Sequence, residues 1–258
     1  MYKGKKFHIK PVAEVIDEID SIPERFIPGI DRVFLADGDA LVYPQQGLLE
    51  ILERLTLKLP ALTRVGSYAS PNSLETKSLE DLKQLRDRKL RILYFGLESG
   101  DDKTLEAVGK GFNSTKMSDL AIKSREAGMK LSVTAILGLA GRDCSLQHAR
   151  STADWINRVN PEYFSLLTLF HRHNEEFVNS LNQCSHGELM LEAYELLKNL
   201  HPNKTILRSN HVSNFINLSG SYPKDRERLI KDMEQSIARA RLHPDFWNEI
   251  PSYQEEYY

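Results

Sequence analysis

The sequence contains little cysteine and no long apolar run, and each shortage removes a class of protein. Among its 258 residues are two cysteines, Cys144 and Cys184, far apart and without CxxC spacing. That pattern excludes a disulfide scaffold and speaks against a zinc finger or an iron-sulfur site held within this chain. No run approaches the ~18 apolar residues of a membrane span, and none follows the basic start 1–11. We therefore expect a cytoplasmic protein with no membrane partner.

The sequence also lacks an excess of either charge. Its 34 basic and 36 acidic side chains give a net charge of -2. This balance excludes a simple polycationic nucleic-acid binder, so we expect no nucleic-acid partner. With 41% apolar and 27% charged residues, the composition is that of a globular protein. No GxxxxGK[ST] or GxGxxG motif supplies a phosphate-binding loop, which speaks against a nucleotide polyphosphate as ligand.

Apolar strand-like runs alternate with amphipathic helical segments along most of the chain. The periodicity predicts a first helix that begins near Pro11, and later helices over 44–59, 78–88, 101–108, 114–127, 146–159, 188–200 and 224–241. It predicts strands over 32–36, 63–68, 92–97, 131–137, 163–169 and 205–207. Such alternation is typical of βαβ units and a parallel sheet. A parallel barrel begins with a strand, whereas this chain begins with a helix, so the predicted order contains only the helical half of its first βα unit.

Polar residues follow the predicted strands, where barrels and open α/β sheets collect their chemistry. The acids Asp37, Asp39 and Glu98 favour a cationic or hydroxyl-rich ligand. Each motif also has a plainer interpretation: a turn with a helix N-cap at 37–39, a first-turn helix acid at Glu98 and a tight turn at 138–141. The remaining strand-end candidates, which we assign to substrate contact or a structural role ahead of metal binding, are His171, His173, Arg208, Asn210 and His211.

Three of these segments, in this order, resemble motifs of the radical S-adenosylmethionine (radical SAM) superfamily, in the branch of iron-sulfur oxidoreductase-like proteins related to elongator-type and coproporphyrinogen-oxidase-like barrels. Ala-Asp-Gly-Asp at 36–39 resembles the family's GGE motif, and Gly-Leu-Glu-Ser-Gly at 96–100 its ribose-contacting motif. Ile-Leu-Gly-Leu-Ala-Gly at 136–141 is similar to its adenine-contacting segment. The resemblance implies that cofactor-binding residues are Asp37, Gly38, Asp39, Ser67, Glu98, Ser99, Ile136, Leu137 and Gly138.

The resemblance implies an incomplete parallel (β/α)6 TIM-like barrel over 1–200, which lacks its first strand and cluster loop, with a helical C-terminal extension over 201–258. It also implies that the complete protein binds a [4Fe-4S] cluster through a CxxxCxxC loop, together with S-adenosylmethionine. That protein would form a 5'-deoxyadenosyl radical that acts on an unknown substrate, with an electron donor as partner. The cluster cysteines are absent from this chain, so we expect it to be inactive as written.

Several alternatives remain open on the sequence. The chain could be a truncated form of a longer enzyme or a natural relative without the cysteines. It could be a non-catalytic adenosyl-binding or interaction module. It could also be a barrel lyase or hydrolase that uses Asp37, Asp39 and a histidine around a divalent metal. A homodimer through the exposed barrel seam is a further expectation.

Overall fold

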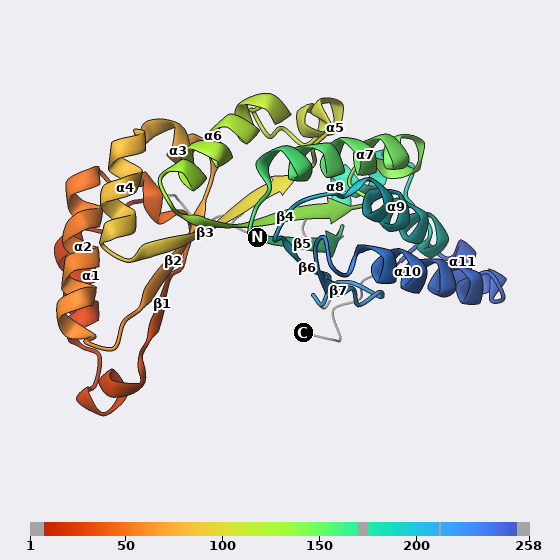
Figure 1. Ribbon diagram of the computed structural model, residues 1–258. Helices are drawn as coiled ribbons and strands as arrows, with labels where there is room; N and C mark the ends of the chain where they lie inside the picture. Colours follow the sequence, from red (N-terminus) through yellow and green to blue (C-terminus); the bar gives the residue numbers. More distant parts are fainter. Residues whose placement is uncertain (1–7, 170–174, 212, 252–258) are drawn as a thin grey trace. The chain divides into compact units, whose positions relative to one another are not determined.

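The strands form one sheet in the order of the chain (Figure 1). The computed structural model describes residues 8–169, 175–211 and 213–251. The strands are β1 (Arg32–Leu35), β2 (Arg64–Ala69), β3 (Leu90–Glu98), β4 (Lys130–Leu137), β5 (Tyr163–Thr168), β6 (Ile206–Arg208) and β7 (Ser219–Ser221). Parallel pairs join β1 to β2, β2 to β3 and β5 to β6, while β7 runs antiparallel to β6. This mostly parallel sheet confirms the predicted fold class, and within the described residues it keeps two edges, β1 and β7.

Helices connect the strands, as the periodicity predicts. They are α1 (Val12–Asp20), α2 (Gln45–Lys58), α3 (Pro71–Thr76), α4 (Leu79–Asp87), α5 (Asp102–Ala107), α6 (Ser114–Glu126), α7 (Gly141–Val159), α8 (Glu175–Ser180), α9 (His186–Asn199), α10 (Arg226–Ala240) and α11 (Pro244–Asn248). Short 3-10 turns lie at Glu24–Gly29 and Ala40–Val42. The predicted capping box at the start of α4 is present, because Ser78 accepts from the Asp81 amide and Asp81 from the Ser78 amide. No helix of the described segments is both long and apolar enough to cross a bilayer.

Four short elements and one helix start differ from the prediction. The segments α3, α8, β7 and α11 are each at most six residues long, too short for periodicity to reveal. Helix α7 begins at Gly141 rather than near 146. Its first turns bury Gly141, Ser145 and His148, which form no apolar stripe that periodicity could detect. The C-terminal part also contains strands, since β6 and β7 extend the sheet past residue 200. The predicted boundary at 200 stays a prediction.

The first of two compact units comprises Met1–Gly96 and Asp119–Ser132. Within it α1 packs on α2, whose buried face consists of leucine and isoleucine side chains. The later segment is fastened to the earlier one by Lys123 on α6. Its ammonium group donates to the carbonyls of Leu74 and Lys77 at 2.6 Å each, so it caps the C-terminal end of α3.

The second unit comprises Leu97–Ser118 and Val133–Tyr258. Helix α9 packs against α7, α10 and α11, and Figure 1 shows α9 beside α7 and α10. The loop after β3 approaches α7 so closely that a Cβ at Gly100 would lie 2.3 Å from the Ser151 carbonyl oxygen. The Gly100 amide donates to the Thr152 hydroxyl at 3.0 Å. Glycine is therefore required at the end of the Gly-Leu-Glu-Ser-Gly segment by backbone packing.

Candidate functional site

In the first unit, the loop after β1 is held in place by Asp39. Its carboxylate accepts from the Leu41 amide at 2.9 Å and from the Ser70 amide at 2.6 Å. Asp39 thereby caps the following 3-10 turn and ties the loop to the start of α3. Nearby, burial lowers the pKa of Lys77, whose ammonium group donates to the Tyr43 carbonyl at 2.6 Å. The Asp39 carboxylate thus has a structural task in the protein, as the plainer interpretation expects.

The other predicted residues of this unit differ in what they offer to a ligand. Asp37 is exposed and has a φ of 61°, and Gly38 follows with a φ of 125°. This left-handed turn presents the Asp37 carboxylate to solvent. Ser67 is fully buried, and its hydroxyl donates to the Tyr68 carbonyl at 2.8 Å. Asp37 is therefore the residue of this group best placed for a ligand cation.

A groove of about 510 Å³ adjoins this loop within the first unit. It is bordered by α1, α2 and β1, and its apolar lining includes Ile19, Leu48 and Ile51. Asp37, Gly38 and Asp39 lie at its polar part. Its volume falls in the range of small-molecule sites, and its mixture of apolar walls with few polar groups is typical of them.

In the second unit, Glu98 ends β3 in a strained conformation. Its φ is 65°, which is uncommon for a residue with a side chain and occurs often at functional sites. The Glu98 carboxylate forms an ion pair with Lys110 at 3.3 Å, and the two side chains are 28% and 19% exposed. The pair thus keeps access to solvent and to a ligand.

The next residue, Ser99, is fully buried and belongs to an internal hydrogen-bond chain. Its hydroxyl lies 2.8 Å from Nδ1 of His148, and it accepts from the Asp101 amide at 2.9 Å. Nε2 of His148 lies 3.1 Å from the Ile136 carbonyl. Since a carbonyl only accepts, Nε2 carries the proton and Nδ1 accepts from Ser99. Burial lowers the pKa of His148 to about 4, in keeping with this neutral tautomer.

The turn after β4 is held by a second buried group, Glu192 on α9. One oxygen accepts from the Gly138 amide at 2.9 Å, and the other lies 2.5 Å from the Ser145 hydroxyl. The first oxygen is also 3.5 Å from Nε2 of His148. Glu192 is fully buried, and burial raises its pKa to about 7. At Gly138 itself φ is 80°, and the Gly141 amide closes the turn on the Gly138 carbonyl at 3.1 Å, as the tight-turn interpretation expects.

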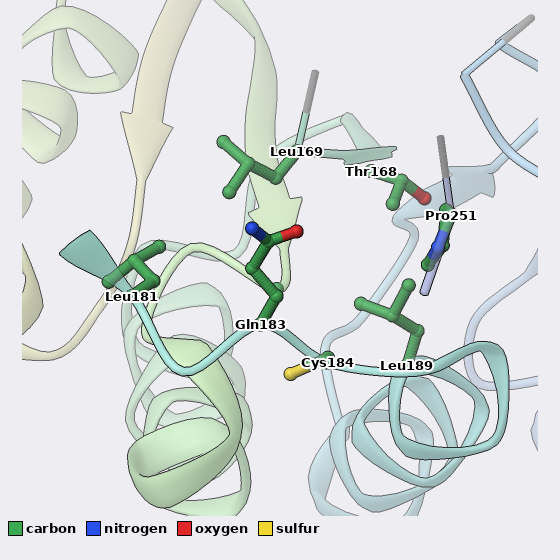
Figure 2. A pocket seen from close by; sticks show the side chains of 8 residues that line it. Thr168, Leu169, Leu181, Gln183, Cys184, Leu189 and Pro251 are labelled. Carbon is green, nitrogen blue, oxygen red and sulfur yellow. The ribbon is translucent and has the colours of Figure 1, made fainter. Parts of the chain in front are cut away.

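A small cavity lies beside Gly138, lined in part by Leu169, Gln183, Cys184 and Leu189 (Figure 2). Its volume of about 20 Å³ suits one water molecule and is far below that of a ligand site. Burial raises the pKa of the Cys184 thiol to about 12. Cys184 is therefore a thiol at neutral pH and a poor nucleophile or metal ligand.

The remaining predicted residues lie at the surface or outside the described segments. Arg208 on β6, Asn210 and His211 are exposed, and Nδ1 of His211 accepts from the Ser213 amide at 3.1 Å. His171 and His173 lie outside the described residues. The structure therefore gathers 37–39 around Ser70 in one unit, and in the other it joins 98–99 to 136–138. It brings Arg208, Asn210 and His211 to neither group by a hydrogen bond.

Sequence reasoning missed His148 and Glu192, although both leave a signal. Ser145, His148 and Thr152 recur at three- and four-residue spacing, which places them on one face of α7. Glu192 falls three residues after Leu189 and four before Leu196, so it lies on the apolar face of α9. A carboxylate at such a position is rarely left unpaired and indicates a buried polar network.

A protein-family comparison accounts for this arrangement. Residues 2–155 match the model of the Radical SAM superfamily, a stretch that contains all three motifs. Since the match covers more than half of the chain, the protein belongs to the radical SAM superfamily. This confirms the resemblance on which the sequence interpretation rests.

Individual relatives are distant. The heme chaperone HemW of Bacillus subtilis is 21% identical over 178 residues, which are 69% of this chain and 46% of HemW. Coproporphyrinogen III oxidase (HemN) of Escherichia coli has a TM-score of 0.58 at 13% identity, over 72% of this chain and 45% of HemN. Elp3 of Methanocaldococcus infernus has a TM-score of 0.55 at 13% identity, over 88% of this chain and 59% of that one. The chain thus spans about half the length of the first relatives it matches, and these likenesses show the fold alone.

The superfamily implies two groups, and the residues of this chain fit them unequally. Each unit by itself offers a group that suits a part of S-adenosylmethionine: in the first unit the exposed Asp37 carboxylate suits an ammonium group, and in the second unit the Glu98 carboxylate suits ribose hydroxyls. For a [4Fe-4S] cluster, the chain offers Cys144 and the buried Cys184 thiol, with no CxxxCxxC. No group of three or more His, Cys, Asp or Glu side chains within the described residues could hold a metal. The acids of each unit therefore suit parts of S-adenosylmethionine, whereas the cysteines of this chain do not suit the cluster.

Proposed function

We propose that this chain is the S-adenosylmethionine-binding part of a radical SAM protein. Asp37, with the backbone of Gly38 and Asp39, takes the methionyl end. Glu98 binds the ribose, and the segment 136–138 at the end of β4 binds the adenine. The observation that carries the proposal is the family match over residues 2–155. The three segments that resemble the family's motifs all lie within that stretch, which supports the proposal.

The internal hydrogen bonds refine which groups of these motifs are available. Ser99 and Ser67 use their hydroxyls within the protein, and Asp39 uses both carboxylate oxygens. Asp37 and Glu98 are the acids with solvent access. The proposed contacts with ligand therefore fall on these two side chains and on backbone and surface atoms of the loops, while the buried partners give the loops their shape.

No radical step is assigned to this chain, because it does not supply the thiolates of a cluster. The substrate of the whole protein and its electron donor remain proposals of class only: a small molecule and a one-electron reductant. The metal-dependent lyase or hydrolase alternative has no supporting observation in the described segments. A non-catalytic adenosyl-binding role uses the same residues and is consistent with the two cysteines.

Titration with S-adenosylmethionine, followed by amide NMR, tests the proposal. We expect weak, saturable shifts confined to 37–39, 98–100 and 136–141, because the chain provides no iron to bind the amino and carboxylate groups. Asp37→Asn should weaken the response at 37–39, whereas Asp143→Asn, an exposed acid on α7, serves as control. Shifts spread evenly over the surface, or none at these three segments, would contradict the assignment.

A further inference from the structure

Two buried titratable residues, His148 and Glu192, connect the second and third ligand motifs. His148 contacts segment 96–100 through Ser99 at 2.8 Å and segment 136–141 through the Ile136 carbonyl at 3.1 Å. Glu192 contacts segment 136–141 through the Gly138 amide at 2.9 Å, and one of its oxygens lies 3.5 Å from Nε2 of His148. One continuous network therefore runs from the Asp101 amide to Gly138 beneath both loops.

These contacts are costly to build, which argues that they have a particular task. A fully buried carboxyl group loses its hydration, and an apolar side chain on α9 would avoid that loss. His148 and Glu192 are 1% and 0% exposed in their side chains, so neither can touch a ligand directly. Their hydrogen bonds go to the two loops and to Ser145, and these loops need a fixed shape if they are to bind an adenosyl group.

We propose that His148 and Glu192 are positioning residues that hold segments 98–101 and 136–138 in one arrangement for an adenosyl ligand, and that protonation of Glu192 loosens its hold on Gly138. The inference rests on the proposed function for its ligand. When Glu192 is ionised, the Gly138 amide donates to a charged acceptor, a hydrogen bond roughly twice as strong as one to a neutral acceptor. The rigidity of the turn at Gly138 therefore depends on pH through the protonation state of Glu192.

The following described residues are the other charged or titratable groups around Glu192 and His148. On α7, His148 faces Glu192, and Asp101 acts on His148 from the first loop. In the segment before α9, burial and the charges of Glu192 and Glu188 raise the pKa of Cys184, while Arg142 lowers it. Glu234 on α10 accepts a hydrogen bond from the Tyr194 hydroxyl, and Glu249 after α11 lies 3.8 Å from His186. Both acids therefore face groups of α9 other than Glu192.

Amide hydrogen exchange, measured by NMR on the full chain at pH 6 and pH 8, tests the inference. After correction for intrinsic rates, and for a local opening in which Glu192 stays buried, we expect Gly138 to exchange about fivefold more slowly at pH 8 than at pH 6, whereas faster exchange at pH 8 would overturn the inference. Glu192→Gln keeps the shape and an acceptor oxygen, and it should abolish this difference. His148→Gln should speed exchange in 98–101 as well as 136–138. Glu195→Gln, one turn further along α9 and bonded to Arg150, is the matched control and should behave as the wild type.

The outcomes separate the inference from the proposed function. If wild type responds to S-adenosylmethionine but Glu192→Gln retains the full pH difference at Gly138, the inference is overturned and the function stands. If Glu195→Gln removes the difference equally, the effect belongs to α9 as a whole and the inference also fails. If the exchange results are as expected but wild type never responds to S-adenosylmethionine, the adenosyl ligand is wrong for both. A response whose affinity falls severalfold in Glu192→Gln at pH 8, with exchange as expected, supports both.

Discussion

Replacement of Glu192 by glutamine should change the slope of the free energy of unfolding against pH. The carboxyl group of Glu192 and the imidazole of His148 are both buried, and their pKa values are shifted by burial to about 7 and about 4. The first shift is upward from 4.5 and the second is downward from 6.5. Both groups are therefore neutral in the folded protein over the range in which both are charged in the unfolded chain.

The two groups act on stability with opposite signs. Glu192 holds its proton more tightly when folded, so its contribution is fully present below pH 4.5 and is lost as the pH rises to about 7. His148 holds its proton less tightly when folded, so its contribution is present above pH 6.5 and is lost as the pH falls to about 4. Each slope is about 1.4 kcal/mol per pH unit. In the wild type the two slopes cancel between pH 4.5 and 6.5.

Glu192→Gln leaves the His148 slope uncompensated. The difference in free energy of unfolding, variant minus wild type, should become more favourable to the variant by about 3 kcal/mol from pH 4.5 to pH 7. His148→Gln should give a difference of opposite slope between pH 4 and pH 6.5. Taking differences removes the contribution of all other titrating groups that the variants share.

Urea titration followed by far-UV circular dichroism, at pH intervals of one half, measures these differences. Glu195→Gln is the control, because the hydrogen bond from Arg150 lowers the pKa of Glu195 from 4.5, so that its slope has the other sign, lies below pH 4.5 and leaves the difference flat from pH 4.5 to 7. A Glu192→Gln difference that stays constant within about 0.5 kcal/mol from pH 4.5 to 7 would refute the reasoning. It would mean that the folded protein holds Glu192 ionised, paired with a protonated His148.

Three further predictions concern packing, capping and assembly. Gly100→Ala should lower the free energy of unfolding by at least about 3 kcal/mol in urea titration, since its Cβ would meet the Ser151 carbonyl oxygen at 2.3 Å; Gly29→Ala, with open space around it, should cost less than about 0.5 kcal/mol. Ser78→Ala should cost about 1 kcal/mol, because the Asp81 amide loses its acceptor at the start of α4; equal stability by calorimetry would contradict this. Among the described strands β1 lies at an edge of the sheet, which should favour a dimer, so light scattering should give twice the monomer mass, and a monodisperse monomer would count against it.

Most of the fold follows from sequence periodicity because the elements bury regular apolar faces. Leu48, Ile51, Leu52 and Leu55 predict α2, and the same face is buried in the structure. The elements that escape prediction bury something else. The inner face of α7 carries Gly141, Ser145, His148 and Thr152, whose burial depends on hydrogen bonds to partners distant in sequence. Local periodicity cannot anticipate such partners.

The ligand roles of the three strand-end segments stay predictions, and the sequence does not show which of their side chains are open to solvent. The order of three strand-end segments predicts their role, but it does not distinguish the solvated Asp37 from Asp39, whose oxygens are taken by two amides. Likewise Glu98 and Ser99 are neighbours, yet one reaches solvent and the other is buried against His148. That division depends on Asp101, α7 and α9, which a motif does not contain.

The division of the chain into two units has a consequence for its synthesis. The first unit includes residues 119–132, so it cannot be completed when residue 96 leaves the ribosome. Residues 97–118 belong to the second unit and are made in between, which takes roughly one to four seconds at about 5–20 residues per second. Throughout that interval Lys123 has not been synthesised, so its hydrogen bonds to the carbonyls of Leu74 and Lys77 cannot form. The first unit therefore stays incomplete while the nascent chain begins the second.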